Sequence, residues 1–155
     1  MKPFLVIIFL MFSALSFGQE TESSLNWLTN LEKAEKISQQ TNKPILLYFT
    51  GSDWCPPCKG LKKDFFETEE FAARADKYVL VLIDLPRRMD IVSEEQLVYN
   101  KKIVKKYNKD NSFPKLLVLN HSGKELGMLS GYSSYSTYQD TSYHFAFVDK
   151  FASSN

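Results

Sequence analysis

This 155-residue sequence has few cysteines and histidines that could bind a metal, and almost no net charge. It has only two cysteines, Cys55 and Cys58, and only two histidines, His121 and His144, which lie far from the cysteines and show no ligand spacing. Because a zinc site needs about four ligands, we expect no metal site. The formal net charge is +1, so the chain lacks the basic surface of a nucleic-acid-binding protein.

Long apolar runs are equally rare, and the single one lies at the N-terminus. It covers residues 4–17, follows Lys2, and is shorter than the roughly 20 residues of a membrane span. Small residues, Ser16 and Gly18, precede a potential cleavage point after Gly18. This pattern predicts a secretory signal peptide over residues 1–18, with an uncleaved N-terminal anchor as the alternative. No cysteine follows the run, which excludes lipid attachment there.

The rest of the composition is typical of one globular domain. Hydrophobic residues make up 44% of the chain and aromatic residues 14%, which excludes a disordered protein. No internal repeat and no low-complexity linker divides it. We expect a polar lead-in over residues 19–24 and one domain over residues 25–155. Export would place that domain in the periplasm or cell envelope, where disulfides persist.

Apolar periodicity and turn signals divide the domain into helices and strands. Thr68 is expected to cap one helix, and Ser93 with Gln96 forms a capping box for another. The order predicts an α/β fold with a central mixed sheet of four to five strands, helices on both faces, an extra N-terminal helix and a final antiparallel hairpin. The expected helices cover residues 25–43, 58–68, 69–76, 94–108 and 136–153, and the expected strands cover residues 44–51, 77–86, 111–120 and 125–132.

The cysteine pair stands between a buried strand and a helix. Cys55 precedes Pro56 and is therefore biased to an extended conformation, while Pro57 suits the first helical position. A helix N-terminus stabilises a thiolate and lowers its pKa. We expect Cys55 to be exposed at the tip, where it attacks a substrate disulfide, and Cys58 to lie slightly inside the first turn, where it resolves the mixed disulfide.

Other uses of the pair fit the residues less well. A disulfide between cysteines two residues apart closes a very short loop, so a purely structural role would remove little chain entropy. A Cys–His hydrolase would need a histidine close to Cys55. His144 lies in an apolar run, where we expect a packed or surface residue.

The stretch W-C-P-P-C-K over residues 54–59, at the end of a strand, resembles the active site of the thioredoxin family. The similarity continues through residues 79–86 and residues 106–132 and covers most of the domain. The form F-T-G-S-x-W-C-x-x-C-K is similar to that of exported thioredoxin-like proteins. The resemblance implies a thioredoxin-like fold and a thiol–disulfide oxidoreductase activity.

The resemblance also implies roles for residues around the pair. Trp54 matches the tryptophan that shields the site and offers a flat surface to partners. Pro114 matches a proline whose bond with Phe113 is cis and whose neighbouring backbone lies against the disulfide and pairs with substrate. Gly131 matches a glycine at which a side chain would obstruct a docking partner. The alternative for each of these residues is a purely structural role, in packing or in a turn.

Further residues of the motif have expected supporting roles. Pro56 and Pro57 stiffen the link and remove backbone donors, so we expect them to tune the redox potential. The family's buried acid on the preceding strand is missing here, which leaves open the base that deprotonates the second cysteine. Lys59, water or Asp53, which we expect to be exposed, are the candidates. Lys115 stands where the family usually has threonine, which would change partner choice.

Two arginines follow the second strand at its carboxyl end. Arg87 and Arg88 are therefore placed where they could lower the pKa of Cys55, although such a pair is more often a solvated loop.

These features together predict an exported enzyme that reduces or exchanges protein disulfides. Its partners would be disulfide-bonded proteins and a membrane-bound or envelope electron donor, with no cofactor, metal or nucleic acid. An oxidase or isomerase using the same pair, a binding or chaperone module without turnover, and peroxide reduction through a sulfenate at Cys55 are the alternatives.

Overall fold

The computed structural model describes residues 25–133 and 140–152. The expected signal peptide over residues 1–18 and the lead-in over residues 19–24 lie outside the described residues. Within the two described ranges, no helix combines the length and the hydropathy that a membrane span requires.

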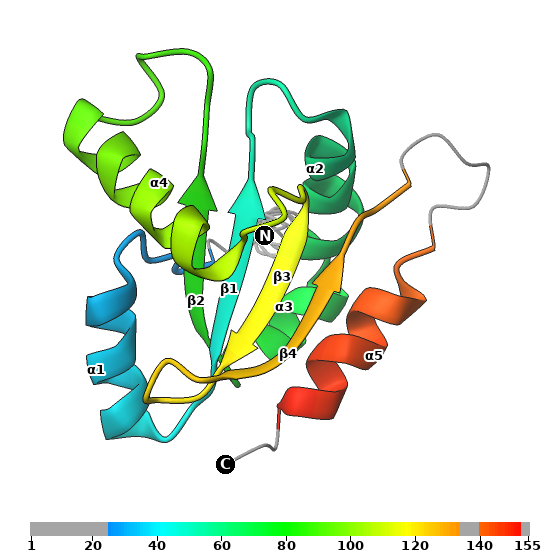
Figure 1. The fold of residues 1–155 in the computed structure, drawn as a ribbon. Helices are drawn as coiled ribbons and strands as arrows, with labels where there is room; N and C mark the ends of the chain where they lie inside the picture. Colours follow the sequence, from blue (N-terminus) through cyan, green and yellow to red (C-terminus); the bar gives the residue numbers. More distant parts are fainter. Residues whose placement is uncertain (1–24, 134–139, 153–155) are drawn as a thin grey trace, which may run out of the picture.

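A mixed sheet of four strands forms the centre of the molecule (Figure 1). In spatial order the strands are β2 (Val79–Asp84), β1 (Ile45–Thr50), β3 (Lys115–Leu119) and β4 (Glu125–Ser130). β1 runs parallel to β2 and antiparallel to β3, and β3 and β4 form the antiparallel hairpin predicted from the sequence. All six residues of β1 are buried, because helices cover both faces of the sheet.

The helices divide between the two faces of the sheet, as Figure 1 shows. α1 (Leu31–Thr41) and α4 (Glu94–Tyr107) pack on one face, where Leu31, Val104 and Phe49 belong to one apolar cluster. The other face carries α2 (Pro56–Leu61), the π-helical turn η2 (Lys62–Phe66), α3 (Glu69–Ala75) and α5 (Ser142–Phe151). The predicted mixed α/β architecture with an N-terminal helix is therefore confirmed.

The N-terminal helix is shorter than predicted. It begins at Leu31, because Asn30 is extended and its side chain accepts a hydrogen bond of 2.7 Å from the Lys33 N–H. Leu28 instead bridges to Val81 in parallel and exchanges backbone hydrogen bonds with both neighbours of that residue in β2. The edge of β2 offers unpaired backbone groups, which satisfy this segment better than a further helical turn.

Capping also differs in one place from the sequence pattern. Thr68 caps α3 as predicted, by accepting from the Phe71 N–H at 3.1 Å. Ser93 accepts from the Gln96 N–H, but the Gln96 amide donates elsewhere, to the Thr29 carbonyl and to Asn100. Only half of the predicted capping box therefore forms, since a tertiary contact takes the second half.

The remaining predicted helices follow the sequence pattern with small shifts. The helix predicted over residues 58–68 divides into α2 and the π-helical turn, and Gly60 lies inside α2. α5 occupies residues 142–151 of the expected closing helix. The first residues of that prediction, 136–139, lie outside the described residues.

Candidate functional site

The two cysteines form a disulfide at the N-terminus of α2. Cys55 is the extended N-cap residue, which the following Pro56 favours, and its Sγ accepts from the Cys58 N–H at 3.2 Å. Cys58 lies in the first turn of the helix, with its Cα 5.3 Å from that of Cys55. The geometry therefore places the Cys55 sulfur at the positive end of the helix, where a thiolate is stabilised.

The exposure expected for the first cysteine is wrong for this oxidised form. Cys55 is only 3% exposed and Cys58 only 1%. The neighbouring Trp54 is fixed beside them, because its indole N–H donates to the Leu85 carbonyl at 2.7 Å and its ring meets Phe113 edge-on at 5.6 Å. Both sulfurs are therefore covered in this oxidised form.

Asp53 ties the segment before the cysteines to the β2–α4 loop (residues 85–92). Its carboxylate accepts from the backbone N–H groups of Arg87, at 3.0 and 3.1 Å, and of Arg88, at 2.9 Å. Burial alone would raise the pKa of the Asp53 carboxyl, but the two N–H groups hold that pKa below its ordinary value. Asp53 is half-buried rather than exposed, and an ionised carboxylate in these bonds is a poor base for Cys58.

The lowered pKa of Asp53 makes a prediction for the loop that it holds. The stabilisation that the ionised Asp53 carboxylate gives the β2–α4 loop is present above pH 3.8, the ordinary pKa of the group. It is lost as the pH falls through the lower pKa of Asp53 in the folded protein. We expect the amide proton resonances of Arg87 and Arg88 to titrate with a midpoint below 3.8, and Asp53→Asn to remove that titration. A midpoint at or above 3.8 in NMR spectra would contradict the assignment.

The other candidate base also has a defined contact. The Lys59 ammonium donates to the Asp53 carbonyl at 2.9 Å and is exposed. Tyr48 of β1 contacts the helix from the sheet, since its hydroxyl donates to the Cys58 carbonyl at 3.2 Å. Burial raises the pKa of Tyr48 to about 12, so this hydroxyl acts as a neutral donor that supports the helix.

Asp84 is a buried carboxylate that the sequence reasoning missed. It is the last residue of β2, pairs in register with Thr50, and is only 7% exposed. Its two oxygens accept from the Ser52 N–H at 2.9 Å and the Ser52 hydroxyl at 2.5 Å. The turn that leads into the cysteines is thus held by an acid 32 residues away. An acid at the carboxyl end of a buried strand was the available signal.

Pro114 and Gly131 lie together, because Pro114 directly precedes β3 and Gly131 directly follows the neighbouring strand β4. The Phe113–Pro114 bond is cis, and the Gly131 N–H donates to the Pro114 carbonyl at 2.8 Å. Gly131 has φ = 87°, which favours glycine, and a Cβ added there would meet no atom of the described chain within 4 Å. The space beside Gly131 is therefore open.

Lys115 and the two arginines differ in how far they can reach a partner. Lys115 is 5% exposed and its ammonium pairs with Asp110 at 2.6 Å, which lowers the pKa of that carboxyl. Arg87 lies over the Trp54 ring, 4.8 Å from its centroid, whereas Arg88 pairs with Asp90. Arg87 therefore packs on Trp54, the residue before the cysteines. The Lys115 ammonium is engaged by Asp110 of its own chain.

His144, in the first turn of α5, is a core residue. His144 is 5% exposed and packs its ring 5.5 Å from that of Phe65, and neither ring nitrogen has a hydrogen-bond partner of good geometry within the described residues. Burial lowers the pKa of His144, which favours the neutral ring. Among the described residues, no group of three His, Cys, Asp or Glu side chains is arranged to hold a metal ion.

Comparison with known proteins extends these observations. Residues 31–142 match the family described as a thioredoxin-like domain. The disulfide bond reductase DsbH of Chlamydia pneumoniae is 33% identical over 108 residues, covering 69% of this chain and 63% of that protein. The thioredoxin-related protein DsbJ of the same organism is 25% identical over 115 residues, covering 72% of this chain and 32% of that protein. A solved DsbH oxidoreductase structure superposes with a TM-score of 0.68 at 29% identity, covering 84% of this chain and 86% of the other.

The extent of these matches decides what they establish. The chain spans 63% and 32% of the lengths of these two curated relatives. The activities in their names therefore describe those proteins and not this chain. The family match, in contrast, covers more than half of the 155 residues and includes every strand, the cysteine pair and the cis-proline. The chain therefore belongs to the thioredoxin-like family.

Proposed function

We propose that the protein is an exported thiol–disulfide oxidoreductase that reduces or exchanges disulfides in other proteins. The observation that carries this proposal is the Cys55–Cys58 disulfide at the N-terminus of α2. A pair at this position can alternate between dithiol and disulfide without rearranging the sheet. The relative named as a disulfide bond reductase supports the reducing direction.

The reaction proceeds through two exchanges. In the reduced protein the Cys55 thiolate attacks one sulfur of a substrate disulfide, that bond breaks, and the other substrate sulfur leaves as a thiolate and takes a proton. Cys58 then loses its proton, to water or to the second substrate sulfur as that sulfur leaves, and attacks the Cys55 sulfur. The second substrate thiol is released. The substrate gains two electrons, and the protein ends with its own disulfide.

The residues around the pair have separate proposed roles. Pro56 and Pro57 begin the helix without backbone donors, so the first N–H of the helix is that of Cys58, which the Cys55 sulfur and the Cys55 carbonyl share. Trp54 with Phe113 shields the pair, and the open space at Gly131 admits a substrate chain. Lys59 steadies the motif through its bond to the Asp53 carbonyl.

The cycle requires a partner that restores the dithiol. Export, which rests on the N-terminal sequence pattern, places the protein away from cytoplasmic reductants, so we propose a membrane-bound or envelope thiol donor of two electrons. An oxidase would use the same pair with electrons flowing the other way, and an isomerase would use it to rearrange substrate disulfides with no net electron transfer.

A reduction assay and a redox titration test the proposal. With dithiothreitol as donor, we expect the full chain to accelerate the reduction of insulin disulfides. Equilibration with glutathione should give a potential near about −270 mV for a reductant, whereas a value near about −120 mV would identify an oxidant. Absence of any acceleration would contradict the oxidoreductase assignment.

A second candidate function is a binding module without turnover. The observation that favours it is the near-complete burial of both cysteines in the oxidised form. It predicts that partner binding persists when Cys55 is replaced by serine.

A further inference from the structure

We propose that a pocket next to the segment that holds Trp54, the residue before the cysteine pair, docks an acidic segment of the substrate protein. This inference rests on the proposed function, because it assigns the pocket to the partner with which the cysteines exchange. The cavity has a volume of about 520 Å³, enough for a few side chains of a peptide. We define the lysine pocket by its lining residues, which are Leu85, Lys101, Val104, Lys105, Asn108, Lys109 and Asn111.

The position of the lysine pocket connects it to the cysteines. Leu85 lines it and also accepts the indole hydrogen bond of Trp54, the residue before Cys55. On the other wall, Asn108 bonds through its side chain to both backbone groups of Ser112, the residue before Phe113. The pocket therefore lies between two segments that both contact Trp54, one through the Leu85 carbonyl and the other through the Phe113 ring, and a bound chain could continue from one to the other.

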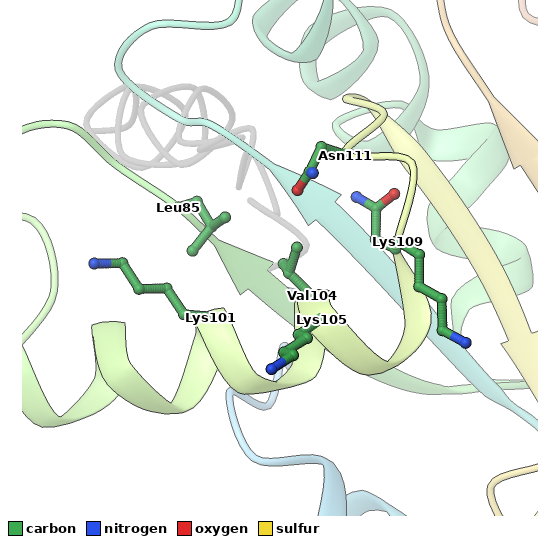
Figure 2. Close-up of a pocket in the computed structure, with 7 residues that line it drawn as sticks. Leu85, Lys101, Val104, Lys105, Lys109 and Asn111 are labelled. Carbon is green, nitrogen blue, oxygen red and sulfur yellow. The ribbon is translucent and has the colours of Figure 1, made fainter.

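The lysine pocket combines an apolar centre with a cationic rim. Figure 2 shows Leu85 and Val104 in the middle, with Lys101 on one side and Lys109 on the other. The lysines Lys101, Lys105 and Lys109 are exposed, and no ion pair joins them to a carboxylate of the described chain. Alternating acidic and aliphatic side chains fit such a surface.

The charge around the pocket favours a negative partner. No Asp or Glu of the described ranges lines it, although the whole chain carries almost equal numbers of acidic and basic residues. The three acids closest to the lining residues along the chain are engaged elsewhere, Asp84 with Ser52, Asp90 with Arg88 and Asp110 with Lys115. Three free cations on one rim raise the local concentration of an acidic chain and slow its departure, most strongly at low salt.

Disulfide-linked peptide substrates test this inference on the full-length protein. A Glu-Leu repeat beside the disulfide is compared with a Gln-Leu repeat and a Lys-Leu repeat of the same length. We expect the wild-type protein to reduce the Glu peptide with a kcat/KM about tenfold above that of the Gln peptide at low salt, and to reduce the Lys peptide more slowly still. High salt should remove the preference.

A matched pair of variants locates the effect. K101Q/K105Q/K109Q should lose the preference for the Glu peptide and keep its rate with the Gln peptide. K33Q/K36Q/K77Q carries the same change in net charge at exposed lysines outside the pocket and should keep the preference. Equal loss in both variants, or no preference in the wild-type protein, would overturn the proposal.

A binding measurement separates this proposal from the proposed function. Fluorescence anisotropy of a cysteine-free Glu-Leu peptide with the oxidised protein reports on docking alone. Binding that only the pocket variant weakens supports the inference, even if no peptide is reduced and the proposed function fails. Reduction of the Gln peptide without binding of the Glu peptide overturns the inference and leaves the function intact. Binding of citrate, without binding of the Glu peptide, would identify a small-anion site and also overturn it.

Discussion

A Cys55→Ser variant is expected to reduce no disulfide above the uncatalysed rate, a loss of at least about a thousandfold. The proposed reaction begins with attack by the Cys55 thiolate, and a serine hydroxyl at the same N-cap is not ionised at neutral pH. Insulin reduction with dithiothreitol as donor measures the loss.

The matched Cys58→Ser variant separates the two roles. It keeps the attacking thiol and lacks the resolving one, so it should accumulate mixed disulfides with partners that a reducing gel releases. Both variants should fold, because the Cys55–Cys58 bond closes a very short loop and contributes little to stability. Mixed disulfides that form with Cys55→Ser and not with Cys58→Ser would show that the assigned order of attack is reversed, and equal formation with both variants would show that either cysteine attacks.

A Phe65→Ala variant is expected to lose about 3–5 kcal/mol of unfolding free energy. Phe65 is fully buried in η2, directly after α2, and its ring lies 4.8 Å from that of Phe71 in α3 and 4.7 Å from that of Phe145 in α5. One side chain thus joins three elements of this face, and its removal leaves a cavity among them.

Chemical denaturation measures the effect against a matched control. Tyr143→Ala also truncates an aromatic residue, but Tyr143 is 72% exposed, so we expect a change within about 0.5 kcal/mol. The midpoint temperature of thermal unfolding should fall by about 10–20 °C for Phe65→Ala and by little for the control. A loss below about 1 kcal/mol at Phe65 would show that the face repacks around the gap.

Much of the fold was predictable because its signals are local. The continuous apolar run over residues 44–51 corresponds to β1, which is buried on both faces. Thr68 and Ser93 start helices where their side chains reach the next free N–H groups. These patterns depend on neighbours in the chain, so single-sequence reasoning recovers them.

Contacts between distant segments were not predictable in the same way. Leu28 has the spacing of a helical residue, but the free edge of β2 draws it into a bridge with Val81. Asp84 looks like an ordinary strand end until strand register places it opposite Thr50 and within reach of Ser52. Sequence reasoning considered Asp53 as a base, whereas the fold uses it to anchor the β2–α4 loop.

The sequence by itself determined the cysteine spacing, the helix start imposed by Pro56 and the alternation of strands and helices, because each depends on torsions and periodicity within a few residues. Only the tertiary structure decided that both sulfurs are buried and that three lysines surround a hollow lined by Leu85, whose carbonyl holds Trp54. Burial depends on which surfaces the sheet and helices bring together, and that information is distributed over the whole chain.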